Sequence, residues 1–234
     1  MKECSGGGGG EKCVAKVFFV RHGESEYNAV RRIQGWRDIP LNERGRQQAA
    51  AVAKRLADEV DASRVVAVVS SSLQRASETA GFVLKALKRD DLTVKTHDGL
   101  REICFGPMEG TYLAAVPPGV DAKANEHNME VFREIWAQWR AGNHTVAVPG
   151  GETPIQLVQR ARAAVAETLS ALFPTPVLFV SNSSSPLLLL LFLMLSFLCT
   201  SPPFIVYPRT RLQLSLLSVM EDASVIFCPT SQES

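Results

Sequence analysis

The chain has 234 residues, of which 46% are hydrophobic, so it is long enough to form one large domain with a sizeable core. Its formal net charge of +1 argues against a polyanion-binding surface, and no nucleic-acid partner is expected. The five cysteines are scattered and lack the pairing of metal sites. An odd, sparse set of this kind predicts free thiols in a reducing, cytoplasmic compartment.

Residues 1–13 differ from the rest of the chain because they contain an uninterrupted glycine run, Gly6–Gly10. The segment has no apolar core of the kind found in secretory signals. A phosphate-binding glycine loop would need a preceding strand and a following Gly-Lys-Ser/Thr, and the sequence has neither. We therefore expect residues 1–13 to be a disordered tail.

The first apolar run, Val17–Val20, predicts a buried strand, and it is followed directly by Arg21, His22 and Gly23. In an open α/β sheet, ligands bind beyond the carboxyl ends of strands. A histidine there can attack an electrophile, the arginine can neutralise an anion, and glycine lets the backbone turn close to a ligand. The pattern indicates phosphoryl transfer through a histidine. Three residues alone are a weak signal, because a lone histidine is more often structural.

After this motif, apolar residues alternate between helical and strand-like spacing. The expected elements are a helix from Asn42 to about Val60, a strand Val65–Val69, a helix burying Ala76, Ala80, Val83, Leu84 and Leu87, a strand Leu92–Thr96, a helix near Met129–Trp139, a helix capped by Thr153 with Ile155, Val158, Val165, Leu169 and Leu172 on its buried face, and a strand Val177–Ser181. This alternation predicts a three-layer α/β/α domain with a mainly parallel central sheet over residues 14–181.

Two further residues are candidates for the same chemistry. Arg75 follows the second predicted strand as Arg21 follows the first, so the two could clamp one phosphoryl group with bidentate hydrogen bonds. The alternative for Arg75 is a solvated helical arginine. Glu102 could supply the proton that the leaving oxygen of a phosphate ester needs. On spacing alone, Glu102 is better interpreted as one more loop glutamate.

Several short motifs occur in one order along the chain, and their combination is far more specific than any one of them. They are Arg21-His22-Gly23-Glu24 with Asn28, Gln34-Gly35, Pro40-Leu41 with Gly45, Ser71, Arg75, Glu78-Thr79-Ala80, Leu100-Arg101-Glu102, Phe105-Gly106, Glu109-Gly110 and Gly151-Glu152. Together they resemble the histidine phosphatase superfamily, the phosphoglycerate mutase-like proteins. The resemblance covers about Lys16 to Ser181.

The resemblance implies a role for each candidate residue. His22 becomes transiently phosphorylated, and Arg21 and Arg75 bind the phosphoryl group. Asn28 and the loop containing Gln34 add contacts to phosphate or substrate. Glu102, as the acid and base, completes the implied catalytic set. No metal and no cofactor are implied, because two guanidiniums can stabilise the charge of the transition state without Mg²⁺.

The segment from Gly110 to Gly150 resembles the shorter insertion of the phosphatase branch of the superfamily. The glycolytic mutases carry a longer insertion with additional substrate-binding arginines, which are not found in this sequence. The resemblance therefore favours a hydrolase of a small phosphomonoester. A phosphotransferase of the phosphoglycerate mutase type is the alternative.

The carboxyl end departs from the family pattern. Family members carry a second His-Gly after the strand corresponding to Val177–Ser181, whereas this chain continues with Asn182. An asparagine can donate a neutral hydrogen bond from a similar place, but it cannot carry the charge of an imidazolium. The sequence therefore predicts a weakened enzyme or, alternatively, a pseudo-enzyme that binds a phosphorylated ligand and turns it over poorly.

Residues 182–234 form an atypical apolar segment. Leu187–Cys199 is apolar except for Ser196, but it is shorter than the roughly 20 residues that a membrane span requires. Pro202 and Pro203 oppose a longer helix. A helix buried against the sheet is favoured over a membrane anchor, and a spliced or misassigned carboxyl end would also explain the change in composition. Ser224–Cys228 is a possible last strand, and the oligomeric state is left open.

Overall fold

The computed structural model describes residues 13–172, 177–181 and 210–217. Its strands form one sheet in the order β3-β2-β4-β1-β5, and every neighbouring pair is parallel. The strands are β1 (Cys13–Arg21), β2 (Ala67–Ser71), β3 (Val94–His97), β4 (Val177–Ser181) and β5 (Thr210–Leu217). The prediction of a mainly parallel sheet is confirmed.

Helices follow the strands along most of the chain. They are α1 (Glu26–Ala29), α2 (Glu43–Glu59), α3 (Gln74–Leu87), α4 (Ala122–Arg140) and α5 (Pro154–Leu172), with short 3-10 helices at Ala62–Arg64, Asp98–Leu100 and Gly106–Met108. The predicted cap of α2 is confirmed, because the side chain of Asn42 accepts a hydrogen bond from the Gly45 amide. Thr153 and Gln156 cap the first turn of α5 reciprocally.

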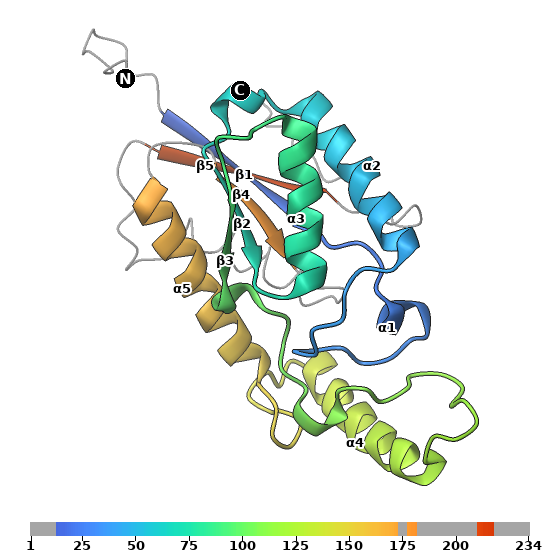
Figure 1. Cartoon of the computed structure of the whole chain (residues 1–234). Helices are drawn as coiled ribbons and strands as arrows, with labels where there is room; N and C mark the ends of the chain where they lie inside the picture. Colours follow the sequence, from blue (N-terminus) through green and yellow to red (C-terminus); the bar gives the residue numbers. More distant parts are fainter. Residues whose placement is uncertain (1–12, 173–176, 182–209, 218–234) are drawn as a thin grey trace, which may run out of the picture.

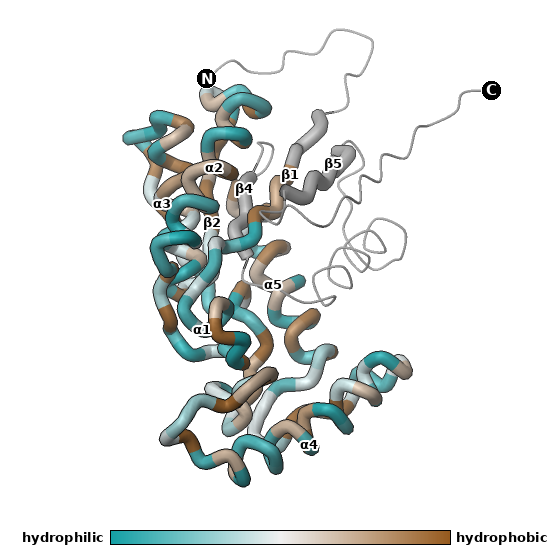
Figure 2. Tube along the Cα trace, turned by 90° about the vertical axis from the view of Figure 1, so that its right-hand side faces the viewer, coloured by the Kyte–Doolittle hydropathy of each residue, from teal (hydrophilic) through white to brown (hydrophobic). Residues whose placement is uncertain are grey.

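The two faces of the sheet are covered by different helices (Figure 1 and Figure 2). On one face, Val20 and Val68 pack in a cluster with residues of α2 and α3, such as Leu56. On the other face, Val17, Phe19, Ala67 and Val69 pack with Leu100 and with Ala164 and Val165 of α5. Alternate residues of a strand point to opposite faces, so the apolar runs of β1 and β2 serve both layers. The three-layer α/β/α prediction is therefore confirmed.

Two details of the helices differ from the prediction. Helix α4 begins at Ala122, well before Met129, with Asp121 as its cap. Its first turns are polar and mostly exposed, so they lack the apolar repeat from which a helix is recognised. Ile155 was expected on the buried face of α5, but 40% of it is exposed. The buried stripe of that helix begins at Pro154 instead, and the adjacent position lies about 100° further round the helix.

The sheet also contains a strand that was not expected. Strand β5 pairs with β1 over Cys13–Val20, although Ser224–Cys228 was the anticipated last strand and lies outside the described residues. Polar and apolar residues alternate over 211–216, which is a strand signal. The alternation is short, and it follows the longer apolar run Leu187–Cys199 in the sequence.

Other predictions also fall outside the described residues: residues 1–12 of the predicted tail 1–13, Asn182 and the apolar run Leu187–Cys199. Cys13, the last residue of the predicted tail, begins β1. Among the residues that the structure describes, none of the helices is both long and apolar enough to cross a membrane.

Cys104 is a free, half-buried thiol whose pKa is raised by burial.

Candidate functional site

The candidate residues gather at the carboxyl edge of the sheet. Arg21 is the last residue of β1 and pairs in register with Ser181 of β4, while Ser71 of β2 pairs with His97 of β3. In Figure 1 this edge faces α1 and α4. The edge is therefore where a ligand is expected in a parallel sheet.

His22 lies just beyond β1 and is almost fully buried, with 3% of its surface exposed. Its Nδ1 lies 2.5 Å from the carbonyl oxygen of Gly23. A carbonyl oxygen can only accept, so Nδ1 must carry the proton in the neutral ring. The lone pair of the neutral imidazole is then on Nε2.

The turn after His22 requires glycine because the chain crosses another backbone there. A methyl group on Gly23 would lie 2.1 Å from the carbonyl oxygen of Gly45, and one on Gly45 would lie 1.9 Å from that of Glu24. The Gly23 amide also donates to Oγ1 of Thr79 at 3.3 Å. These contacts fix the His22 turn against the first turn of α2 and against α3.

Arg75 lies in the first turn of α3 and is 1% exposed, so the alternative of a solvated arginine is wrong. Its Nη1 and Nη2 each donate to a backbone carbonyl, those of Arg37 and Gly35, at 2.9 Å. Its Nε has no acceptor, and it is the one buried side-chain nitrogen or oxygen in this condition within the described part of the chain. Such a donor costs about 1–3 kcal/mol unless something accepts from it.

The electrostatics connect Arg21 and Arg75 to the same carboxylate. Burial lowers the pKa of both guanidiniums, and the charge of Glu102 opposes this shift in each. Arginine stays protonated in proteins, so two partly desolvated guanidiniums both interact electrostatically with the Glu102 carboxylate. The structure thus brings together the three charged residues that the sequence placed on separate segments.

Glu102 itself is buried, with 8% of its surface exposed. One carboxyl oxygen, Oε1, accepts from the amide of Ile103 at 3.0 Å. Its backbone carbonyl accepts from Nε1 of Trp36 at 2.7 Å. Glu102 is therefore a buried and hydrogen-bonded residue whose charge acts on both arginines, and its role as acid and base stays a prediction.

The loop that carries Gln34 joins these parts. Its Gly35 carbonyl binds Arg75, and Trp36 binds the backbone of Glu102. The Gln34 side chain is buried and accepts from Oγ of Ser25 at 2.5 Å. Asn28, which is half-buried, caps α1 by accepting from the Ser25 amide. The structure thus assigns framework contacts to Gln34 and Asn28, and their substrate contacts stay a prediction.

The family of the chain follows from its similarity to known proteins. The model of the histidine phosphatase superfamily (branch 1) matches residues 17–196. The chain belongs to this superfamily.

Relatives within the superfamily carry both mutase and phosphatase names. The chain is 47% identical over 138 residues to phosphoglycerate mutase-like protein 4 of Arabidopsis thaliana, covering 58% of this chain and 52% of that relative. It therefore spans about half the length of this plant relative. It is also 31% identical over 173 residues to a probable phosphoglycerate mutase GpmB of Yersinia pestis, covering 72% of this chain and 70% of the relative.

Solved structures of the superfamily share the fold. Bacillus stearothermophilus YhfR superposes with a TM-score of 0.61 at 30% identity, covering 81% of this chain and 86% of that chain. A mycobacterial glucosyl-3-phosphoglycerate phosphatase bound to VO3 superposes with a TM-score of 0.59 at 30% identity, covering 76% of this chain and 79% of that chain.

Sequence reasoning missed several residues of this superfamily site. Thr79 and Glu152 appear in the sequence only as parts of motifs, and Trp36, in the loop that contains Gln34, was not predicted as a site residue. Arg160, which binds Glu152 and the backbone around Glu102, was not singled out. Arg160 follows Glu152 by eight positions, so no rule for i,i+3 or i,i+4 pairs identifies it.

Proposed function

We propose that the chain is a cofactor-independent hydrolase of small phosphomonoesters that acts through a phosphohistidine on His22. The observation that carries this proposal is the buried Nε of Arg75, which has no acceptor. The charge of Glu102 acts on both Arg21 and Arg75, which connects the two guanidiniums to one site. A phosphoryl group supplies the anionic oxygens that such donors bind.

The proposed reaction has two in-line steps. In the first, Nε2 of His22 forms a bond to phosphorus while the bond to the ester oxygen breaks, and Glu102 protonates that oxygen. In the second, water attacks the phosphohistidine, its proton passes to Glu102, and inorganic phosphate leaves. Arg21 and Arg75 stabilise the equatorial oxygens in both steps.

A mutase-type phosphotransferase uses the same first step, so the acceptor of the phosphoryl group separates the two functions. The resemblance of the 110–150 segment to the shorter insertion favours water as the acceptor. Similar solved structures include a glucosyl-3-phosphoglycerate phosphatase and a putative α-ribazole-5'-P phosphatase, which supports a phosphorylated alcohol as the substrate class.

The test of the function is a screen of phosphomonoesters in the presence of a chelator. We expect release of inorganic phosphate without added metal from at least one small phosphorylated alcohol. Transfer to a second hydroxyl of phosphoglycerate, with no phosphate released, would instead establish the mutase function. Phosphate binding with no turnover of any ester would establish the pseudo-enzyme.

The role of Glu102 predicts a substrate-dependent effect of Glu102→Gln. The variant should lower kcat for alkyl esters about 100-fold, because their poor leaving groups need the proton, and lower kcat for aryl esters much less. Steady-state rates on a matched pair of phosphate esters measure this. Glu167→Gln, at an exposed ion pair with His97, should change neither rate. Equal losses on both esters would assign Glu102 a structural role.

The absent second histidine predicts a gain of activity for Asn182→His. The register of the sheet pairs Ser181, the residue before Asn182, with Arg21, the residue before His22. An imidazolium that follows Ser181 would add one more donor to the transition-state oxygens, which is worth about a hundredfold in rate. We expect kcat to rise by this order while the inhibition constant of inorganic phosphate changes little.

The control for this variant is Asn143→His, at an exposed loop position, which should leave turnover unchanged. An Asn182→His chain with unaltered kcat would show that position 182 does not act on the reacting group. The pseudo-enzyme would then be the better account of the chain.

A further inference from the structure

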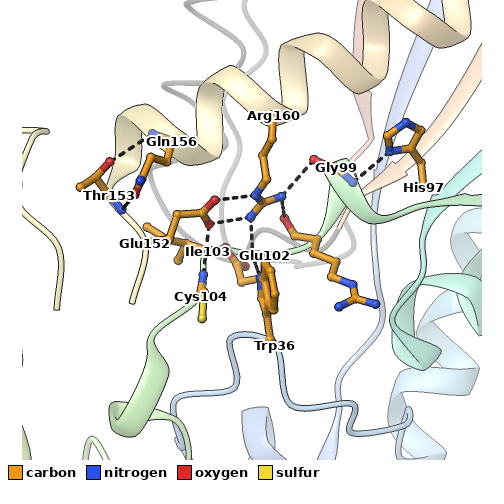
Figure 3. A network of polar contacts seen from close by, with 11 residues as sticks. Trp36, His97, Gly99, Glu102, Ile103, Cys104, Glu152, Thr153, Gln156 and Arg160 are labelled. Carbon is orange, nitrogen blue, oxygen red and sulfur yellow. Dashed lines mark hydrogen bonds and ion pairs between the residues drawn. The ribbon is translucent and has the colours of Figure 1, made fainter. Parts of the chain in front are cut away.

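The loop that carries Glu102 is held by one side chain of α5. The guanidinium of Arg160 donates to three carbonyl oxygens along this loop. These are the carbonyls of Gly99 at 3.0 Å, Arg101 at 2.7 Å and Glu102 at 2.7 Å, as Figure 3 shows. Two more bonds go to the Glu152 carboxylate, from Nε to Oε1 at 2.6 Å and from Nη2 to Oε2 at 2.8 Å. A guanidinium has five N–H donors, and these bonds use all of them.

The contacts fix the peptide group from which the Glu102 side chain projects. Its carbonyl oxygen accepts from Nη2 of Arg160 and also from Nε1 of Trp36 at 2.7 Å, so both lone pairs are used. The amide of the same peptide group, that of Ile103, donates to the Glu102 carboxyl group itself. Backbone and side chain of the acid are thus restrained by separate partners.

The charge of Arg160 is neutralised by the carboxylate of Glu152, which binds it through both oxygens. Glu152 is itself tied to this loop, because its Oε2 accepts from the Cys104 amide and its own amide donates to the Cys104 carbonyl. Both side chains of the ion pair are mostly buried, with 21% and 13% exposed. Arg160 therefore contributes geometry at the loop more than an additional positive charge for the phosphoryl group.

We propose that Arg160 is a positioning residue for proton transfer, which acts through the backbone of Glu102 and is itself oriented by Glu152. This inference rests on the proposed hydrolase function. A proton donor must lie within hydrogen-bond reach of the leaving oxygen, and a misplacement of about 1 Å can cost about 100-fold in rate. The five bonds of Arg160 set where the acid lies along its loop.

The decisive variant is Arg160→Lys, which keeps a positive charge near Glu152 but lacks the planar fork that reaches three carbonyls. We expect kcat for an alkyl ester to fall about 10- to 100-fold. We expect kcat for an aryl ester to stay within about threefold of the wild type, because its leaving group needs little protonation. KM for both esters should change little, since Arg21 and Arg75 are untouched.

A double-mutant cycle with Glu102→Gln separates positioning from general destabilisation. If Arg160 acts through Glu102, Arg160→Lys should lower the alkyl-ester rate by no more than about threefold when Glu102 is already replaced. A residue that merely holds the fold together would lower the rate in both backgrounds.

Arg89 provides a matched control. It also pairs with a carboxylate, that of Asp91, and donates to the backbone carbonyls of Ala62 and Val65, which lie just before the amino end of β2. Arg89→Lys should lower the melting temperature without changing the ratio of alkyl to aryl rates. If Arg160→Lys does not fold, Glu152→Gln serves as the second variant, with the same selectivity expected in smaller measure.

The outcomes distinguish this inference from the function on which it rests. Wild-type chain that hydrolyses neither ester defeats the hydrolase proposal itself. An active wild type with a selective Glu102→Gln, combined with equal losses on both esters for Arg160→Lys, overturns the positioning role alone. Selective loss on the alkyl ester that disappears in the Glu102→Gln background supports it.

Discussion

Replacing His22 with alanine should abolish turnover, with kcat lowered by at least about 10³-fold, because the variant lacks the atom that bonds to phosphorus. The ring is buried and its Nδ1 is committed to the Gly23 carbonyl, so Nε2 is the nucleophile that is lost. Steady-state phosphate release measures the first effect. We expect the wild type to form an acid-labile phosphoenzyme from ³²P-labelled ester, and acid-quenched reactions of the variant should contain none.

The control for this prediction is His97→Asn, because His97 also ends a strand at the carboxyl edge of the sheet. Its Nδ1 accepts from the Gly99 amide, and an asparagine oxygen can replace that acceptor. His97→Asn should keep both turnover and label. Label that still attaches to the His22→Ala chain would place the phosphorylated residue elsewhere.

Much of the fold follows from local patterns because the β1–α2–β2–α3 part has regular apolar spacing and recognisable ends. Asn42 and Thr153 cap the helices that they were expected to cap. The failures occur where the local pattern is silent or misleading. The polar first turns of α4 have no apolar repeat, and Ile155 is apolar but lies beside the buried stripe of α5.

The order of the strands could not be derived from spacing. Strand β4 comes late in the sequence, yet it lies between β1 and β2, and β5 lies on the other side of β1. These pairings join residues more than 100 positions apart in the chain, such as Phe19 with Phe179. They depend on the packing of whole elements, which no short window of sequence reports.

The candidate site shows the same division. Arg21 and His22 were recognisable as site residues because their motif directly follows the first predicted strand. Arg75 was recognisable because it follows the second predicted strand. The sequence did not indicate that Arg75 is buried with an unpaired Nε, because its partners, Gly35 and Arg37, come from a distant loop. Arg160 was missed for the same reason: its contacts are long-range and mostly with backbone atoms.

The second large effect is expected for Arg75→Gln, which should lower kcat/KM about 10³-fold, the lower end of what a transition-state arginine supplies in phosphoryl transfer. The variant removes a buried positive charge and the donor that has no acceptor in the protein. Competitive inhibition by vanadate, which resembles the transition state, should weaken by a comparable factor, whereas inhibition by phosphate should weaken less.

Because Arg75 also holds the carbonyls of Gly35 and Arg37, its loss could act through the loop and not through the substrate. Arg75→Lys separates the two causes, since it keeps the charge but not the fork, and we expect it to recover only part of the vanadate affinity. Arg46→Gln is the matched control: Arg46 also donates to a carbonyl, that of Leu41, and pairs with Glu78, yet it should leave kcat/KM unchanged. Equal affinity for vanadate in wild type and Arg75→Gln would mean that the unpaired nitrogen does not face the phosphoryl group. The proposal that Arg21 and Arg75 bind the same phosphoryl group would then be wrong.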